Sequence, residues 1–141
     1  MSKKFLMYLV LCFGLLFAES NPQYNQDIKV EKILKTDTTS IGQKISYLNT
    51  DNPEVTILKV TIPPGKETGW HKHVFPVFAY VENGALSVEL ENGKQVKFTK
   101  GSSFAEVINT FHDGKNEGNE DLVLIAFYLG EKDKPLSIKK R

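Results

Sequence analysis

The stretch Gly65–Gly84 reads GKETGWHKHVFPVFAYVENG and places two histidines two residues apart in a β-like run. On a β-strand, side chains at positions i and i+2 project to the same face, so the imidazoles of His71 and His73 can converge without a bend in the backbone. The chain has three histidines, and the third, His112, lies in a second segment punctuated by glycine. Three imidazoles brought together by a barrel would form a site for a divalent metal ion.

The composition is that of one soluble globular domain. A chain of 141 residues suits a single domain, and its 40% hydrophobic and 25% charged residues are ordinary for a folded protein. The formal net charge is +1, and no basic cluster precedes Lys139-Lys140-Arg141, so nothing points to a nucleic-acid partner. We therefore expect a small-molecule ligand and no nucleic acid, and a homodimer is compatible with the sequence.

The first eighteen residues have the pattern of a secretory signal peptide. Two lysines precede an uncharged apolar run over residues 5–18, and charge returns at Glu19. The run is shorter than the ~20 residues that a membrane-spanning helix needs. We expect residues 1–18 to be removed, so that the mature protein is periplasmic or secreted, with no stable membrane insertion.

Two alternatives keep the chain at a membrane. An uncleaved N-terminus would act as an anchor, and Leu9–Cys12 has the outline of a bacterial lipoprotein box, in which Cys12 would carry lipid. That box prefers a small residue before the cysteine, whereas this chain has Leu11. Because the chain has one cysteine, a mature form without it has no disulfide and no thiolate metal ligand.

From Ile28 onward the sequence favours strands. Short runs rich in β-branched and aromatic residues alternate with Gly, Pro and Asn turn residues. These runs predict strands over residues 29–34, 44–48, 55–62, 70–73, 77–81, 85–90, 95–98, 103–107 and 122–129. Asn83-Gly84 and Asn92-Gly93 predict hairpin turns, because Asn-Gly accepts the positive φ angles of tight turns.

Many short strands joined by such turns predict an antiparallel sandwich or barrel, whose interior receives alternate side chains. The expected organisation is a flexible lead over residues 19–27, one all-β, single-domain jelly-roll β-barrel over residues 28–130, and a polar, loop-like C-terminal tail over residues 131–141. Apolar residues do not recur at helical spacing over a useful length.

Two motifs, in this order, resemble those of the cupin superfamily. The first family motif, G-x5-H-x-H-x3-E-x6-G, is matched by Gly65, His71, His73 and Gly84. Its glutamate position holds Val77. The second motif, G-x5-P-x-G-x2-H-x3-N, is matched by Gly101, His112 and Asn116, with Val107 for the proline and Asn109 for the glycine. The chain is most similar to small secreted single-domain bacterial cupins, over roughly residues 55–130.

The resemblance implies a β-barrel of six to eight strands with one metal ion bound by His71, His73 and His112. Without the family's glutamate, the donor set is three neutral imidazoles, which leaves the charge of the ion uncompensated and coordination positions open. Such a set is compatible with Fe(II), Zn(II), Ni(II), Cu(II) or Mn(II). Some three-histidine cupins bind iron and oxidise their substrates, so the missing glutamate is compatible with catalysis.

Glu106 and Tyr80 are the candidate catalytic residues. Glu106 lies an even number of residues before His112, so the two side chains share a face if the strand is regular. Glu106 would then replace the family's glutamate or act as a general base. The alternative for Glu106 is a surface or structural role. Tyr80 either offers its hydroxyl to a ligand or belongs to the core and cavity wall.

Three functions fit these features. The first is a metal-dependent enzyme of the dioxygenase type, acting on a small molecule in the envelope compartment. The second is a non-catalytic module that senses or sequesters a metal or a small ligand, as the small size and missing glutamate suggest. The third is an isomerase or epimerase, in which Glu106 or Tyr80 would carry the proton.

Overall fold

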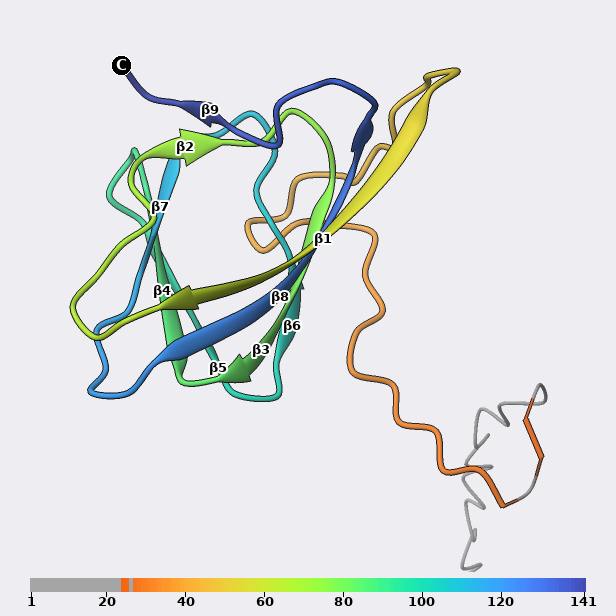
Figure 1. The fold of residues 1–141 in the computed structure, drawn as a ribbon, viewed down its shortest axis with the longest axis horizontal. Coiled ribbons are helices and arrows are strands. Elements are labelled where there is room, and N and C mark those ends of the chain that lie inside the picture. The colour runs from red at the N-terminus through yellow and green to blue at the C-terminus, as the bar shows by residue number, and fades with distance from the viewer. Residues whose placement is uncertain (1–23, 26) are drawn as a thin grey trace, which may run out of the picture. The chain divides into compact units, whose positions relative to one another are not determined.

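The computed structural model describes residues 24–25 and 27–141 (Figure 1). The chain divides into two units, residues 1–31 and 32–141, and every strand of the described residues belongs to the second unit. The described residues form strands, turns and loops, and they include no helix that is long and apolar enough to cross a membrane.

The expected signal peptide over residues 1–18 lies outside the described residues, as does Cys12. Most of the expected flexible lead over residues 19–27 lies outside them as well. In its described part, the Ile28 amide donates a hydrogen bond to the Asn25 carbonyl oxygen at 3.0 Å.

The strands of the described residues form two antiparallel sheets (Figure 1). The first sheet has the order β1-β8-β3-β6, with bounds β1 Pro53–Ile62, β8 Leu122–Glu131, β3 Val77–Asn83 and β6 Ser103–Ala105. The second has the order β5-β4-β7-β2-β9, with bounds β5 Gln95–Thr99, β4 Ala85–Leu90, β7 His112–Lys115, β2 His71–Lys72 and β9 Ile138–Lys139. The prediction of a single-domain, all-β jelly-roll fold is confirmed.

The apolar core lies between the two sheets. Alternation along β3 and β8 points every second side chain inward, because successive residues of a strand face opposite sides. The buried core residues are Ile62, Ala79, Val81, Phe104, Leu122 and Leu124 of the first sheet and Leu86, Val88 and Leu90 of the second. Phe98 on β5 stacks on Phe104 of β6, with ring centroids 3.7 Å apart, and joins the two sheets at one end.

One of the two predicted Asn-Gly hairpins is confirmed and the other is wrong. Asn92-Gly93 joins β4 to β5, which pair directly. Asn83-Gly84 instead carries the chain from the first sheet to the second, because both edges of β3 are already paired, with β8 and with β6. A Cβ at Gly84 would lie 3.0 Å from Leu122 Cα, and φ there is +76°, so this crossover requires glycine.

The predicted strands over residues 29–34 and 44–48 are wrong. These segments form no strand, and Lys44 makes one isolated bridge with Thr38. Their β propensity finds no partner strand, and propensity alone does not make a strand. In the other direction, β7 and β9 form where the sequence predicted none. Both are short and polar, and pairing with β2 holds them in place.

Candidate metal centre

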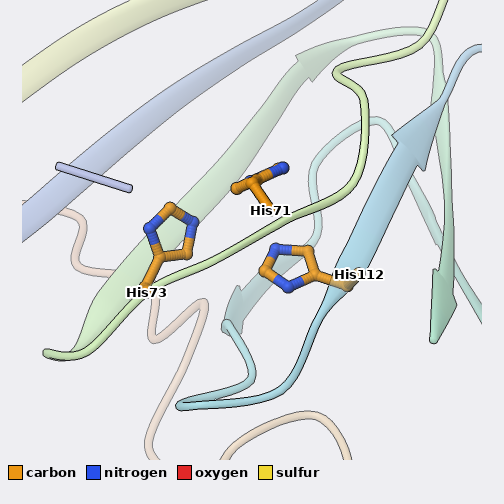
Figure 2. Close-up of side chains that lie close together, drawn as sticks. All are labelled: His71, His73 and His112. Carbon is orange, nitrogen blue, oxygen red and sulfur yellow. The ribbon is translucent and has the colours of Figure 1, made fainter. Parts of the chain in front are cut away.

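The structure brings the three predicted histidines together. His71 on β2 and His112 on β7 lie directly opposite each other in an antiparallel pair, so their side chains share one face. His73 follows two residues after His71 and faces the same way. Figure 2 shows the three rings close together. Their centroids are 4.4 to 5.4 Å apart. One nitrogen from each ring lies within 4.8 Å of the others.

Backbone carbonyl groups fix the orientation of all three rings. Each Nδ1 lies within hydrogen-bond distance of a carbonyl oxygen, namely Gly69 for His71 (2.7 Å), Leu136 for His73 (2.8 Å) and Thr110 for His112 (3.0 Å). A carbonyl oxygen only accepts hydrogen bonds, so each Nδ1 carries a proton and donates it. The lone pair of each neutral ring is then on Nε2, the arrangement that metal-binding histidines use.

Glu106 lies among these nitrogen atoms. Its Oε2 is 3.0 Å from Nε2 of His112 and 3.4 Å from Nε2 of His73. The Glu106 amide donates a hydrogen bond to the Val77 carbonyl oxygen at 2.8 Å, which extends the β3–β6 register by one pair. Glu106, the residue directly after β6, therefore lies across from Val77 and on the same face. The chain lacks the family's glutamate at position 77 but has a carboxylate one strand away.

The ionisation of the site reflects these contacts. Burial alone would raise the pKa of Glu106, but the hydrogen bonds and charges of His112 and His73 outweigh it and hold that pKa well below its usual range. Burial alone would lower the pKa of His112, but Glu106 outweighs it, and the net shift is upward. Burial lowers the pKa of His71, which therefore stays neutral. Without a metal ion, the protonated imidazole of His112 forms an ion pair with the carboxylate of Glu106.

The contacts of Glu106 have the spacing of ligands around one divalent metal ion. Metal–ligand bonds of about 2.0–2.2 Å place two ligand atoms about 3 Å apart at right angles and about 3.4 Å apart at the tetrahedral angle. The Glu106 separations of 3.0 and 3.4 Å match these values. A negative oxygen facing the lone pairs of neutral imidazoles is repulsive unless a cation lies between them, and either a proton or a metal ion meets that need.

Tyr80 is not brought to the histidines. It lies on the outer face of β3 and lines a separate pocket with Ile33, Leu34 and Phe127. The tyrosine at the site is Tyr128 on β8, which the sequence reasoning missed. The signal was present in the alternation of β8, because Leu122, Leu124, Ala126 and Tyr128 share one parity.

Tyr128 lies beside the histidines and keeps its proton. It pairs with Val77 across β3 and β8, and its ring centroid is 5.5 Å from that of His73. Burial, followed by the negative charge of Glu106, raises the pKa of Tyr128 to about 12. Its hydroxyl is therefore available as a hydrogen-bond donor.

Asp113, which the sequence reasoning also missed, supports the site indirectly through the segment that orients His71. Its buried Oδ1 accepts hydrogen bonds from the Gly69 amide at 3.0 Å and from Thr68 Oγ1 at 3.2 Å. Because the Gly69 carbonyl group orients His71, Asp113 positions that ring through one intermediate residue.

The two departures from the second family motif lie at positions with structural roles. Asn109, at the glycine position, has a φ of 53°, a left-handed conformation that Asn tolerates better than most residues. Its amide donates to the His73 carbonyl oxygen at 2.8 Å. Val107, at the proline position, is buried in the core. The Asn116 side chain donates to the Ile62 carbonyl oxygen at 2.8 Å, which is a structural role.

The site opens into a cavity of about 610 Å³. Its walls include His71, His73, Tyr128, Trp70 and Leu58. A smaller pocket shares the first three of these residues and adds Glu106 and His112. The metal centre therefore adjoins a space the size of a small ligand.

Comparisons with known proteins agree with this architecture. A sequence model described as a cupin domain matches residues 58–128, about half of the chain. No curated protein sequence matches it. The DMSP lyase DddQ from Ruegeria pomeroyi DSS-3 superposes with a TM-score of 0.53 at 12% identity, over 64% of this chain and 44% of that one. A cupin domain from Bordetella pertussis Tohama I superposes with a TM-score of 0.50 at 24% identity, over 69% and 98%.

At these identities the two structures support the fold alone, and the chain spans less than half the length of the lyase. The domain match covers both histidine segments and the strands between them. With the two-sheet fold and the gathered histidines, it shows that this chain belongs to the cupin superfamily.

Proposed function

We propose that the chain binds one divalent metal ion through Nε2 of His71, His73 and His112 and through the carboxylate of Glu106. The observation that carries this proposal is the orientation of the rings. One backbone carbonyl group holds the Nδ1 of each ring and leaves its Nε2 to face the cluster. Glu106 supplies the negative charge that the family's glutamate would otherwise provide. Three nitrogen donors and one oxygen donor suit Fe(II), Zn(II), Ni(II), Cu(II) or Mn(II).

The function best supported is that of a metal-dependent enzyme acting on a small molecule in the adjoining cavity, of the dioxygenase type. A bound metal ion would supply Lewis-acid or redox chemistry there. Around it, the histidines set the geometry, and the protonated hydroxyl of Tyr128 donates a hydrogen bond to the ligand. Trp70 and Leu58 belong to the residues that line the cavity. The signal-peptide pattern of residues 1–18 supports a secreted or periplasmic bacterial enzyme.

One observation favours a non-catalytic binding module as the second candidate. Both histidine contacts of Glu106 engage the same oxygen, so this carboxylate is committed to the cluster and is a poor general base. No other acidic residue lines the two pockets in the described part of the chain. An isomerase or epimerase would therefore depend on Tyr128 as its proton carrier.

Metal analysis of purified variants tests the proposal. Replacement of His71, His73 or His112 by Ala, or of Glu106 by Gln, should lower the bound metal measured by mass spectrometry, with little change in the circular dichroism spectrum. Glu54→Gln, at an exposed position on β1, is the matched control and should leave metal content unchanged. Unaltered metal content in both His73→Ala and His112→Ala would sink the proposal.

Activity and export need separate measurements. Dioxygen uptake by the metal-loaded chain, measured with a panel of small organic molecules, distinguishes the enzyme from the binding module, which would bind without turnover. Intact-mass measurement on protein from its native host tests export. A mature chain that begins near Glu19 is expected, and retention of residues 1–18 or lipid on Cys12 would contradict it.

A further inference from the structure

The C-terminal strand β9 forms part of the wall of the ligand cavity. It lies beside β2 (Figure 1), and Lys139 pairs directly opposite His71. Directly opposed residues of an antiparallel pair project to the same face, so Lys139 shares the face of a histidine at the metal centre. The cavity lining accordingly includes both residues.

The position of this segment is fixed at two points. The Leu136 carbonyl oxygen accepts the hydrogen bond from Nδ1 of His73 at 2.8 Å. The Lys140 amide donates to the Trp70 carbonyl oxygen at 2.9 Å. Lys139 lies between these two anchors, so its backbone is held against the site.

Lys139 offers a positive charge that the described protein does not neutralise. Its neighbour Lys140 is engaged, with Nζ 3.4 Å from Glu91 Oε2 and 5.3 Å from the centre of the Trp70 ring. Across residues 24–25 and 27–141, the structure gives the Lys139 side chain no acidic partner, and no Asp or Glu lines the large cavity. The cavity thus carries a net positive charge from its own side chains.

We propose that Lys139 is an anion-binding residue of this cavity, and that the ligand is a small organic acid whose carboxylate or sulfonate group meets its ammonium group. This inference rests on the proposed function, since it names the class of molecule that the site receives. Leu58, Trp70 and Leu136 provide apolar wall for the body of such a molecule. Lys139 is an exposed residue at the rim of the cavity, and an ammonium group makes its strongest hydrogen bonds with anionic oxygens.

Isothermal titration calorimetry of the zinc-loaded protein measures binding in this cavity. The probes are benzoate and benzenesulfonate, each paired with its uncharged amide, benzamide and benzenesulfonamide. We expect at least one anion to bind more tightly than its amide, and the better anion identifies carboxylate or sulfonate as the preferred group.

Variants at position 139 test the role of the charge. Lys139→Met keeps the aliphatic stem and removes the charge, so it should weaken anion binding about tenfold and leave amide binding unchanged. Lys139→Arg should retain most of the anion affinity. Lys134→Met, a neighbouring lysine outside the cavity lining, is the control and should bind like the parent chain.

Several outcomes would overturn the inference. These are the absence of saturable binding by either anion, no preference for an anion over its amide, or equal anion affinity in Lys139→Met and the parent chain. Metal content is measured in each variant, and loss of zinc in Lys139→Met would also overturn it. A parent chain that binds no zinc would instead defeat the proposed function, and the same titrations on the metal-free chain would still decide the role of Lys139.

Discussion

The two sheets contribute to the site by different means. In the first sheet, β1 and β8 are ten residues long, and β3, which pairs with β8 and β6, is largely buried. In the second, β2 and β9 have two residues each. Single polar contacts, such as that of His73 with the Leu136 carbonyl oxygen, hold this part of the sheet in place. Long strands with an apolar face supply stability, whereas short strands anchored by single hydrogen bonds supply geometry. Damage to one should therefore leave the other measurably intact.

The largest expected effect is on the first sheet. Leu122 on β8 is fully buried, so Leu122→Ala should lower the free energy of unfolding by about 2–5 kcal/mol through lost burial and the cavity left behind. Val55→Ala, at a 62% exposed position on β1, should cost about 1 kcal/mol or less. Urea denaturation measures both. Equal losses of unfolding free energy in the two variants would show that β8 does not carry the core. The metal stoichiometry of the folded variants should not change.

The next effect concerns the carboxylate that faces Val77. Glu106→Val should weaken zinc binding by about 10–100-fold, since it removes a proposed ligand and its charge. Adding Val77→Glu to that variant should recover most of the affinity, because positions 77 and 106 are opposite each other on one face. Competition with a chromophoric chelator measures both affinities.

If position 77 instead faces away from the histidines, the metal-free double variant should be less stable than Glu106→Val, since a buried glutamate without a cation costs free energy. If the double variant folds and binds zinc no better than Glu106→Val, position 77 does not reach the metal. Glu54→Gln again serves as the control on β1.

The smallest effect is the pH dependence of metal binding. Because Glu106 raises the pKa of His112 above its ordinary value of 6.5, protons compete with the metal at His112 up to a higher pH. Zinc affinity should therefore rise with pH until this pKa is passed, by at most about tenfold per pH unit for one proton. In Glu106→Gln the pKa of His112 falls, and the rise should move to lower pH. If the pH profile of zinc affinity is the same in Glu106→Gln and the parent chain, Glu106 does not set the pKa of His112.

The histidine cluster could be predicted because it depends on local geometry. The i, i+2 spacing of His71 and His73 requires only that the segment be extended. His112 was placed by its position in a second motif. The Asn92-Gly93 hairpin was predictable for the same local reason, since the turn residues determine it.

The rest depends on strand pairing that one sequence does not reveal. Glu106 was a candidate on its parity with His112, but the two residues lie near strands of different sheets. Glu106 reaches the site through its pairing with Val77 instead. Tyr128 was missed because the inward parity of β8 could not be linked to the histidines. The polar segment around Lys139 becomes a strand only because β2 offers it an edge.

Anomalous diffraction from crystals of the zinc-loaded protein tests the central claim most directly. The expected result is one strong peak at the zinc edge, within about 2.0–2.2 Å of Nε2 of His71, His73 and His112 and of one Glu106 carboxylate oxygen. A peak bonded to the histidines but not to Glu106 would remove the carboxylate from the proposed donor set. A peak elsewhere, or one that contacts fewer than three histidines, would contradict the proposed metal centre itself.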